Sequence, residues 1–446
     1  MAGRSPSPMR GRGRSVGALL LSSFGSSAGT IAFTTIVGKF VYDLSGSELD
    51  LGLLGLAQFL PAFLLVLVAG TVIDGADRRR VMVAGSVAQA IVVAILAWYV
   101  GTRPTSVVPI FGLVLLFGVG QAFSAPAMRL LPADMVDAAD LPWMIARNSV
   151  AGEAGLIAGP VVTAFLYAAD VRLPFVVIAA LLVAAAIAIT RAELRPDLGD
   201  RRLGRGPTPV LDRREVAAEA AQEAAIEPAA ARSAVVTPGT GMRDALEGLR
   251  FVSRDPIVLG AISLDLFAVL FGGAVALLPA IAKDRLGVGV VDLGWLRAAT
   301  GIGAGAMTLI LATQPVRRRI GRTLLLVVAL FGVFTIVLGL SRSFVVAFLA
   351  LVVLSGADAI SVFIRATLVP LATPDDKRGR VMAVENVFIG ASNELGGFES
   401  GVTGQLLGTS GSVVLGGAAT LVVAAAWSIL FPSLRRLDRF PGVPPP

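Results

Sequence analysis

The chain has 446 residues, of which 55% are hydrophobic and 15% charged, with a mean hydropathy of +0.80. A water-soluble domain cannot bury so much apolar surface, so the composition excludes that class and predicts a polytopic membrane protein. Cysteine and histidine are absent, which excludes disulfides, thiolate metal sites and histidine proton carriers. We therefore expect no metal and no cofactor, and any proton carrier must be a carboxylate.

Residues 1–15 form a basic leader, and the apolar run behind it is too long for a signal peptide and lacks a clean cleavage site. Apolar runs of about 20 residues then recur along the chain, each long enough to cross a ~30 Å hydrocarbon layer as a helix. The twelve predicted spans cover residues 17–42, 49–73, 81–100, 107–130, 144–167, 175–191, 257–281, 293–313, 323–340, 344–369, 381–407 and 413–431.

The segment between spans six and seven is charged and rich in Ala, Pro and Arg. It divides the chain into an N-terminal six-helix bundle (1–193), a cytoplasmic linker (194–256) and a C-terminal six-helix bundle with a short cytoplasmic tail (257–446). The end of the linker has apolar residues at steps of three and four: Met242, Ala245, Leu246, Leu249 and Val252. This spacing predicts an amphipathic helix near 241–254 on the cytoplasmic surface, with an ordinary solvated helix as the alternative.

Basic residues are concentrated in alternate turns of the chain, which sets the orientation of a membrane protein. One set of turns contains Arg78, Arg79, Arg80, Arg317, Arg318, Arg319, Arg322, Lys377, Arg378 and Arg380. The opposite turns contain only Arg103, Arg172, Lys283, Arg285 and Arg342. We therefore expect an inner cell membrane protein with both termini in the cytoplasm. The net charge of +7 reflects this orientation and not nucleic-acid binding.

The turn after span two, GTVIDGADRRR at residues 70–80, resembles the signature G-x-x-x-D-R-x-G-R-[RK] of major facilitator transporters. The matching positions are Gly70, Asp74, Arg78 and Arg79, whereas Gly75 replaces the Arg and Asp77 replaces the Gly. The resemblance implies an all-α fold of twelve transmembrane helices in two six-helix repeats, with the substrate site between the halves. It also implies that this turn latches the cytoplasmic gate; a plain positive-inside turn is the alternative.

Span five contains Gly152-Glu-Ala-Gly155-Leu-Ile-Ala-Gly159-Pro160, which is similar to the proton-antiporter motif of the same family. Gly155 and Gly159 lie four residues apart and permit close helix approach, and Pro160 bends the helix. The resemblance implies export in preference to uptake. The terminal glycine pair of the motif is missing, and packing alone is the alternative interpretation.

The segments 365–368, 373–381 and 392–401 resemble the enterobactin-exporter-like branch of the superfamily. The charged turn within them is the counterpart of the first gate turn, and we include Asp375, Arg378, Arg380 and Glu385 among the gate residues. One departure concerns span four, where Phe117-Gly-Val-Gly120-Gln121 has no preceding Arg. Many drug exporters carry a proton-linked Arg there, so coupling through that group is excluded.

Ionisable groups within the spans are costly and are often functional. The candidates for proton coupling are Glu394, Asp265, Glu153, Asp358 and Glu399. On the helix of span eleven, one stripe contains Asn386, Asn393, Gly397 and Ser400. Glu394 flanks this stripe and Glu399 points away from it, so we favour Glu394 as the acid that faces the cavity.

Other charges in the spans require partners. Asp358 and Arg365 are seven residues apart on one helix face, about 10 Å, so each needs a partner from another span. A structural ion pair or hydrogen bond is the alternative role for each acid.

Candidate substrate contacts lie on spans that line the cavity in the family fold: Phe24, Gln58, Gln121, Asn148, Phe267, Arg365, Asn386 and Asn393. Gly397 joins Gly155, Gly159 and Pro160 as a helix-packing residue. No phosphate-binding G-x-x-x-x-G-K-[ST] motif occurs, which excludes an ATP-driven pump, and no catalytic constellation indicates an enzyme.

The sequence thus predicts a monomeric secondary transporter that exports a siderophore, drug or other metabolite by alternating access. Its partners would be the small-molecule substrate, protons and the lipid bilayer. Uptake of a small molecule or lipid is the nearest rival function, and a non-transporting membrane scaffold or sensor is the alternative from another class.

Overall fold

The computed structural model describes residues 9–136, 140–192, 242–374 and 377–441, and within these ranges it contains helices and no strands. The elements in chain order are α1 (Met9–Ser45), α2 (Glu48–Gly75), α3 (Arg78–Gly101), α4 (Val108–Met135), α5 (Leu141–Ala169), α6 (Leu173–Thr190), α9 (Met242–Arg254), α10 (Pro256–Phe271), η2 (Gly273–Leu277), α11 (Leu278–Ala280), η3 (Ile281–Arg285), α12 (Val290–Thr313), α13 (Ile320–Leu340), α14 (Phe344–Ala372), α15 (Arg378–Leu430) and α16 (Pro432–Arg435).

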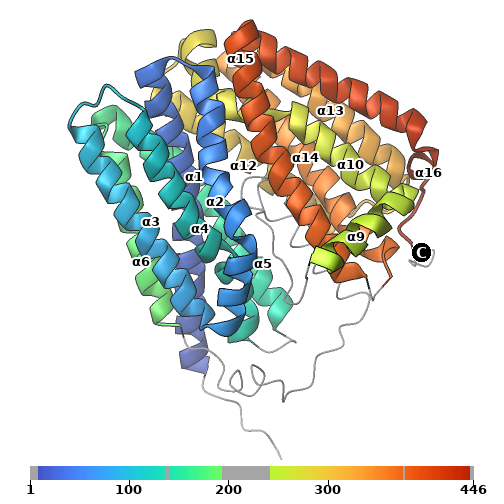
Figure 1. Ribbon diagram of the computed structural model, residues 1–446, viewed down its shortest axis with the longest axis horizontal. Helices are drawn as coiled ribbons and strands as arrows, with labels where there is room; N and C mark the ends of the chain where they lie inside the picture. The colour runs from blue at the N-terminus through green and yellow to red at the C-terminus, as the bar shows by residue number, and fades with distance from the viewer. Residues whose placement is uncertain (1–8, 137–139, 193–241, 375–376, 442–446) are drawn as a thin grey trace, which may run out of the picture.

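The spans form two halves, an N half from α1 to α6 and a C half from α10 to α15, which are blue to green and yellow to red in Figure 1. Consecutive spans run in opposite directions, so their ends gather at two faces. We call the face where α1 ends and α2 begins the Ser45 face. The face where α2 ends and α3 begins is the Arg78 face.

Eleven of the described helical segments are long and apolar enough to cross a membrane. The longest, α15, has 53 residues and contains both span eleven and span twelve, so the predicted twelve-span, all-α fold is confirmed. The two spans meet at Gly408, whose φ of 74° and ψ of 159° are not helical. A positive φ of this kind is accessible to glycine at little cost, so this residue allows the chain to reverse without a loop.

Span seven departs from the continuous helix predicted over 257–281. Its α-helix α10 ends at Phe271, and the rest of the span is the 3-10 turn η2, the short α11 and the π-helical turn η3. The break lies where two backbones touch, because a Cβ on Gly273 would lie 2.1 Å from the carbonyl oxygen of Gly396 in α15. This contact depends on two glycines far apart in sequence, so the pattern of span seven alone could not predict it.

Each half has its own apolar core. In the N half, Phe33 of α1 stacks on Phe117 of α4 with ring centroids 3.9 Å apart. In the C half, Phe267 of α10 packs against Trp427 of α15 at 5.3 Å. Large apolar side chains such as Leu406 remain exposed on the outside of the bundle, as expected for residues in contact with lipid.

The predicted linker helix is present as α9, and it packs against the C half. Val252 is 1% exposed and shares a core with Val381 and Val384 of α15. Glu247 of α9 forms an ion pair with Arg380 at 2.9 Å. The helix is therefore joined to the Arg78 face by both apolar and charged contacts.

The glycines of α5 bring this helix close to α1. A Cβ on Gly155 would lie 2.5 Å from the carbonyl oxygen of Phe24, and a Cβ on Gly159 would lie 2.5 Å from that of Ala28. A Cβ on Gly152, by contrast, would have Ser27 Oγ as its nearest neighbour, at 3.4 Å. Two of the three glycines in the motif therefore sit where any larger residue would push the helices apart.

We expect Gly159→Ala to lower the free energy of unfolding by about 1–3 kcal/mol, because the methyl group overpacks a backbone contact. Gly152→Ala on the same helix is the matched control and should leave stability unchanged or raise it by up to about 1 kcal/mol, because alanine has the higher helix propensity. Thermal unfolding of the purified protein in detergent measures both. Equal losses in the two variants would contradict the packing argument.

Candidate functional site

A cavity of about 560 Å³ lies between the two halves. The N half lines it with residues of α1, α2, α4 and α5 and with Gln89 of α3, and the C half with residues of the broken span seven, α12, α13, α14 and α15. The volume is within the range of small-molecule sites, ~300–1,000 Å³. A ligand in this cavity would contact both halves at once.

A chain of uncharged polar groups crosses the N-half wall of the cavity. Thr34 Oγ1 donates a hydrogen bond to Gln58 Oε1 at 3.2 Å, and Gln58 Nε2 donates to Gln121 Oε1 at 3.1 Å. These residues come from α1, α2 and α4, respectively. The wall therefore offers amide and hydroxyl groups, and the described lining contains few aromatic side chains, among them Phe59 and Phe331.

Five charged side chains line the cavity among the described residues. Arg129 and Glu153 come from the N half, and Arg297, Asp358 and Glu394 come from the C half. Arg297 and Glu394 both line the cavity, and no hydrogen bond or ion pair within 4.0 Å joins them in the described structure. The Nε atom of Arg297 is buried and has no hydrogen-bond partner there.

The carboxylates of Glu394 and Glu153 reach across the contact between the halves. Glu394 is on α15, and its Oε2 lies 3.0 Å from the position that a Cβ would occupy on Gly55 of α2. Glu153 is on α5, and its Oε2 lies 4.0 Å from the Cβ position of Gly305 on α12. Each half thus places an acid from its fifth span against the second span of the other half.

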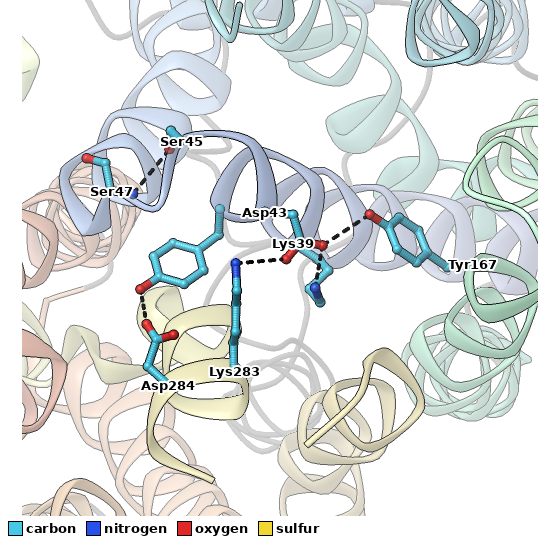
Figure 2. Close-up of polar contacts among 8 residues, drawn as sticks. Lys39, Asp43, Ser45, Ser47, Tyr167, Lys283 and Asp284 are labelled. Atoms are coloured by element: carbon cyan, nitrogen blue, oxygen red, sulfur yellow. Dashed lines mark hydrogen bonds and ion pairs between the residues drawn. The ribbon is translucent and has the colours of Figure 1, made fainter. Parts of the chain in front are cut away.

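Contacts between the halves close the Ser45 face (Figure 2). Lys283 Nζ of η3 lies 3.4 Å from Asp43 Oδ1 of α1, and the Tyr42 hydroxyl donates a hydrogen bond to Asp284. Asp43 also accepts from Lys39 and Tyr167 within the N half.

Further contacts between α2 and α15 lie beside this network. Ser47 Oγ donates to Gln405 Oε1 at 3.2 Å, and Thr409 Oγ1 donates to Glu48 Oε1 at 2.9 Å. The backbones also touch, because a Cβ on Gly401 would lie 2.9 Å from the Cα of Gly52. Polar and backbone contacts together seal this face of the cavity.

At the Arg78 face, the ion pairs observed in the described structure join residues of the same half. Arg78 pairs with Asp134 at 2.9 Å within the N half, and Arg380 of the C half pairs with Glu247 of α9, which packs on that half. The cavity lining extends in this direction as far as Ala133 and Leu141, where α4 ends and α5 begins. The cavity is therefore sealed at one face and approaches the other.

A second charged cluster lies outside the cavity, within the C half. Arg365 of α14 pairs with Asp265 of α10 at 2.7 Å and lies 3.8 Å from Glu385 of α15. The three residues are 2%, 5% and 7% exposed. Arg365 thus finds its partners on other spans, as the helix geometry predicts, and the cluster ties three helices together.

The structure brings part of the predicted set to the cavity. The residues that line it are Gln58, Gln121, Asn148, Asn393, Glu153, Asp358, Glu394 and Gly397. Glu399 does not line it, which agrees with the helical positions of the two acids on span eleven. Pro160 packs through its carbonyl oxygen against Gly294 of α12, where a Cβ would lie 2.8 Å away.

Five further predicted residues do not line this cavity: Phe24, Phe267, Arg365, Asn386 and Asp265. Arg365 and Asp265 are buried against each other, and Phe267 packs on Trp427. Phe24 lies where its own backbone meets Gly155. Asn386 lies seven residues before Asn393, about 10 Å along the helix and beyond the lining.

The predicted gate residues are only partly described. Arg79 donates to the carbonyl oxygen of Ala192 at 3.0 Å, and Arg378 donates to that of Pro370 at 3.1 Å. Glu385 lies in the buried cluster of Arg365, and Gly70 lies near the end of α2. The side chain of Asp74 and all of Asp375 lie outside the described part of the chain.

Sequence reasoning missed Arg297 and Arg129. Arg297 is the eighth residue of α12. An arginine inside an apolar span is itself a sequence signal for a functional residue, so this position could have been found from the sequence. Arg129 lies near the end of α4, where a basic residue is easily taken for part of the flanking turn. Both side chains alter the charge of the cavity.

Comparisons with known proteins agree with this geometry. A family model of the Major Facilitator Superfamily matches residues 19–393. No curated protein is detectably similar to this sequence. Among solved structures, the chain is similar to the human organic anion transporter MFSD10 (TETRAN), with a TM-score of 0.58 and 18% identity over 94% of this chain and 100% of that one.

Two further transporter structures are similar in fold. The nucleoside transporter NupG has a TM-score of 0.64 and 15% identity over 94% of this chain and 99% of that one. A bacterial homologue of the human lysosomal transporter Spinster, in an inward-facing and unoccupied conformation, has a TM-score of 0.64 and 14% identity over 96% of this chain and 97% of that one. At these identities the likeness concerns the fold alone.

Proposed function

Because the chain belongs to the Major Facilitator Superfamily, it is a multi-pass membrane transporter of small molecules, and we propose that it exports an organic compound in exchange for protons. The observation that carries this proposal is the cavity of about 560 Å³, which both halves line and which contains three carboxylates. Such a cavity suits alternating access, in which the halves rock about a central site. Candidate substrates are siderophores, drugs and other metabolites.

We propose that the Arg78 face is cytoplasmic, because the basic turns at 78–80, 317–322 and 377–380 lie there. In this orientation both termini lie inside the cell. We also propose that the protein is a monomer in the inner cell membrane. In this orientation the sealed Ser45 face is external and the cavity extends toward the cytoplasm. This is the state in which an exporter takes up its substrate.

Rocking to the opposite state would separate the contacts of the Ser45 face and bring the two charged turns of the Arg78 face together. The residues that we propose for this second latch are Gly70, Asp74, Arg78, Arg79, Asp375, Arg378 and Arg380. Carboxylate and guanidinium groups make strong, reversible contacts, which suits a latch that forms once in each cycle.

Glu394 is our candidate for the proton carrier, because its carboxylate lies against Gly55 at the contact between the halves. An ionised carboxylate is costly to bury in an apolar contact, whereas its protonated form costs less. Proton exchange at Glu394 would therefore bias α2 and α15 toward staying together or separating. Glu153 is placed in a comparable position on α5, and Asp358 is a third acid of the cavity.

The test uses proteoliposomes that contain a trapped pH-sensitive dye and carry an imposed proton gradient. We expect wild-type protein to couple substrate flux to proton movement and Glu394→Gln to lose this coupling. Glu399→Gln is the matched control, because it removes an acid from the same helix but outside the cavity. Substrate flux without proton movement would refute antiport, and inward flux down the same gradient would establish uptake.

A further inference from the structure

Uncharged polar side chains are concentrated on one wall of the cavity. Twelve of the fifteen serine, threonine, asparagine and glutamine residues that line it come from the N half, and three come from the C half. Most of the C-half lining is apolar or glycine, including Val275, Leu293 and Phe331. A compound in the cavity would therefore meet hydrogen-bonding groups on one side and a largely apolar wall on the other.

Gln89 reaches this cavity from α3, a helix that contributes no other described residue to the lining. Its entry depends on two glycines at the contact of α3 with α4. A Cβ on Gly120 would lie 2.7 Å from Gln89 Cγ, and a Cβ on Gly85 would lie 2.7 Å from the carbonyl oxygen of Gly120. Because neither glycine has a side chain, α3 packs closely on α4 and the Gln89 side chain extends to the cavity.

Gln89 continues the chain of uncharged polar groups on the N-half wall. Ser124 Oγ of α4 donates a hydrogen bond to Gln89 Oε1 at 3.2 Å. Ser124 lies three residues after Gln121 and on the same face of α4. The oxygen of the Gln89 amide is therefore occupied. Its Nε2 is a buried donor without a hydrogen-bond partner in the described structure, and the residue is only 2% exposed.

Asn148 of α5 gives the same wall an acceptor of the opposite kind. It lies against α1, because Ser23 Oγ donates to its backbone carbonyl oxygen at 3.2 Å. Its side-chain Oδ1 is buried and has no hydrogen-bond partner among the described residues. Buried polar groups are normally paired, and an unpaired one is costly. A ligand that supplies both an acceptor for Gln89 and a donor for Asn148 would gain from each contact.

A hydroxyl group both donates and accepts, so a compound with several hydroxyl groups could pair with both residues. A carboxylate only accepts and an ammonium group only donates, so either would leave one of the two residues unpaired. We propose that the substrate is an uncharged polyhydroxylated compound with an apolar group, such as an aryl or alkyl glycoside, and that Gln89 and Asn148 bind its hydroxyl groups. This inference rests on the proposed export of an organic compound and names its class.

The test measures binding of tritiated phenyl β-D-glucopyranoside to the protein in lipid nanodiscs that are free of glycoside detergents. Wild-type protein is expected to bind it saturably and to bind its tetra-O-methyl derivative about tenfold more weakly or worse, because ether oxygens cannot donate. Phenyl β-D-glucuronide, which carries a carboxylate, and glucose, which lacks the apolar group, should also bind more weakly. Equal or tighter binding of any of these three compounds, or no binding of the glucoside by folded protein, would overturn the proposal.

Two variants test the assigned residues. Gln89→Met keeps the length of the side chain but removes the amide, and it should weaken glucoside binding about three- to tenfold. Asn148→Leu should weaken it similarly and reduce the discrimination against the methylated derivative, because the acceptor that needs a hydroxyl donor is gone. Gln314→Met, at an exposed glutamine after the end of α12, is the matched control and should leave binding unchanged.

Unchanged glucoside affinity in either cavity variant would overturn the role of that residue. Equal weakening of the glucoside and its methylated derivative in Asn148→Leu would overturn hydroxyl recognition there, because a structural defect weakens both.

The outcome is distinguishable from failure of the proposed transport reaction. Glucoside binding that depends on Gln89, with no proton movement in proteoliposomes, would retain this substrate class and refute proton exchange. Proton exchange coupled to a charged compound, and unaffected by excess glucoside, would retain the transport reaction and refute the substrate class.

Discussion

A disulfide between cysteines introduced as Glu48→Cys and Gly404→Cys is expected to abolish transport, and a reducing agent is expected to restore it. The two positions lie on α2 and α15, on opposite halves, and a Cβ on Gly404 would lie 2.9 Å from the Cβ of Glu48. A spread of less than 1 Å brings this pair to the separation of ~3.8 Å typical of disulfides. The bond would hold the Ser45 face closed, so the cavity could not open on that side.

The natural chain contains no cysteine, so the introduced pair is the only one that can react. Gly25→Cys/Ala185→Cys is the matched control, because its two Cβ positions are 3.2 Å apart but join α1 and α6 within the N half. We expect this second disulfide to leave transport largely intact. Each single-cysteine variant reports the effect of the substitution itself, and unchanged flux after complete oxidation of the first pair would refute opening at the Ser45 face.

Arg365→Met is expected to lower the free energy of unfolding by about 3–5 kcal/mol, the typical cost of removing one partner from a buried ion pair. Arg365 is 2% exposed and lies 2.7 Å from Asp265 and 3.8 Å from Glu385. Its removal would take from both buried carboxylates the guanidinium that they share. Thermal unfolding in detergent measures the loss.

Restoring charge balance should recover much of this stability. In Arg365→Met/Asp265→Asn/Glu385→Gln, the acids become neutral amides, so the uncompensated charge disappears. We expect at least half of the lost stability to return. Arg342→Met, at an exposed arginine in a turn of the same half, is the control and should change stability by less than about 0.5 kcal/mol. A comparable loss in both single variants would show that the cluster contributes little.

The number and order of the spans were predictable, because apolar length is a local property of the sequence. The position of Glu394 was also predictable, since the helical repeat separates its face from that of Glu399. The spacing of Asp358 and Arg365 showed that they could not pair with each other, but it could not identify Asp265 as the partner of Arg365. Helix geometry gives the face of a residue, whereas the neighbouring helix is set by tertiary packing.

The break in span seven has a similar explanation. Gly272 and Gly273 are ordinary in a membrane helix, and only their neighbours make them necessary: Gly396 of α15 approaches Gly273, and the Phe331 ring of α13 approaches Gly272. Four residues that were predicted to line the cavity do not line it. The family fold indicates which spans surround the cavity, but it does not give the side of each span that faces inward. Phe267 shows the consequence, since it lies on a cavity-lining span but packs against Trp427 on another side.

Gly408 has a consequence for how the protein is made. Spans eleven and twelve are joined by this single non-helical residue, so no hydrophilic loop exists to be carried across the bilayer separately. We therefore expect the two spans to enter the membrane together as a helical hairpin. Basic residues flank both of its open ends, with Arg378 and Arg380 before it and Arg435 and Arg436 after it, and in the orientation that we propose they would hold both ends on the cytoplasmic side. A peptide added at Gly408 would therefore disrupt this pair of helices while it enters the membrane.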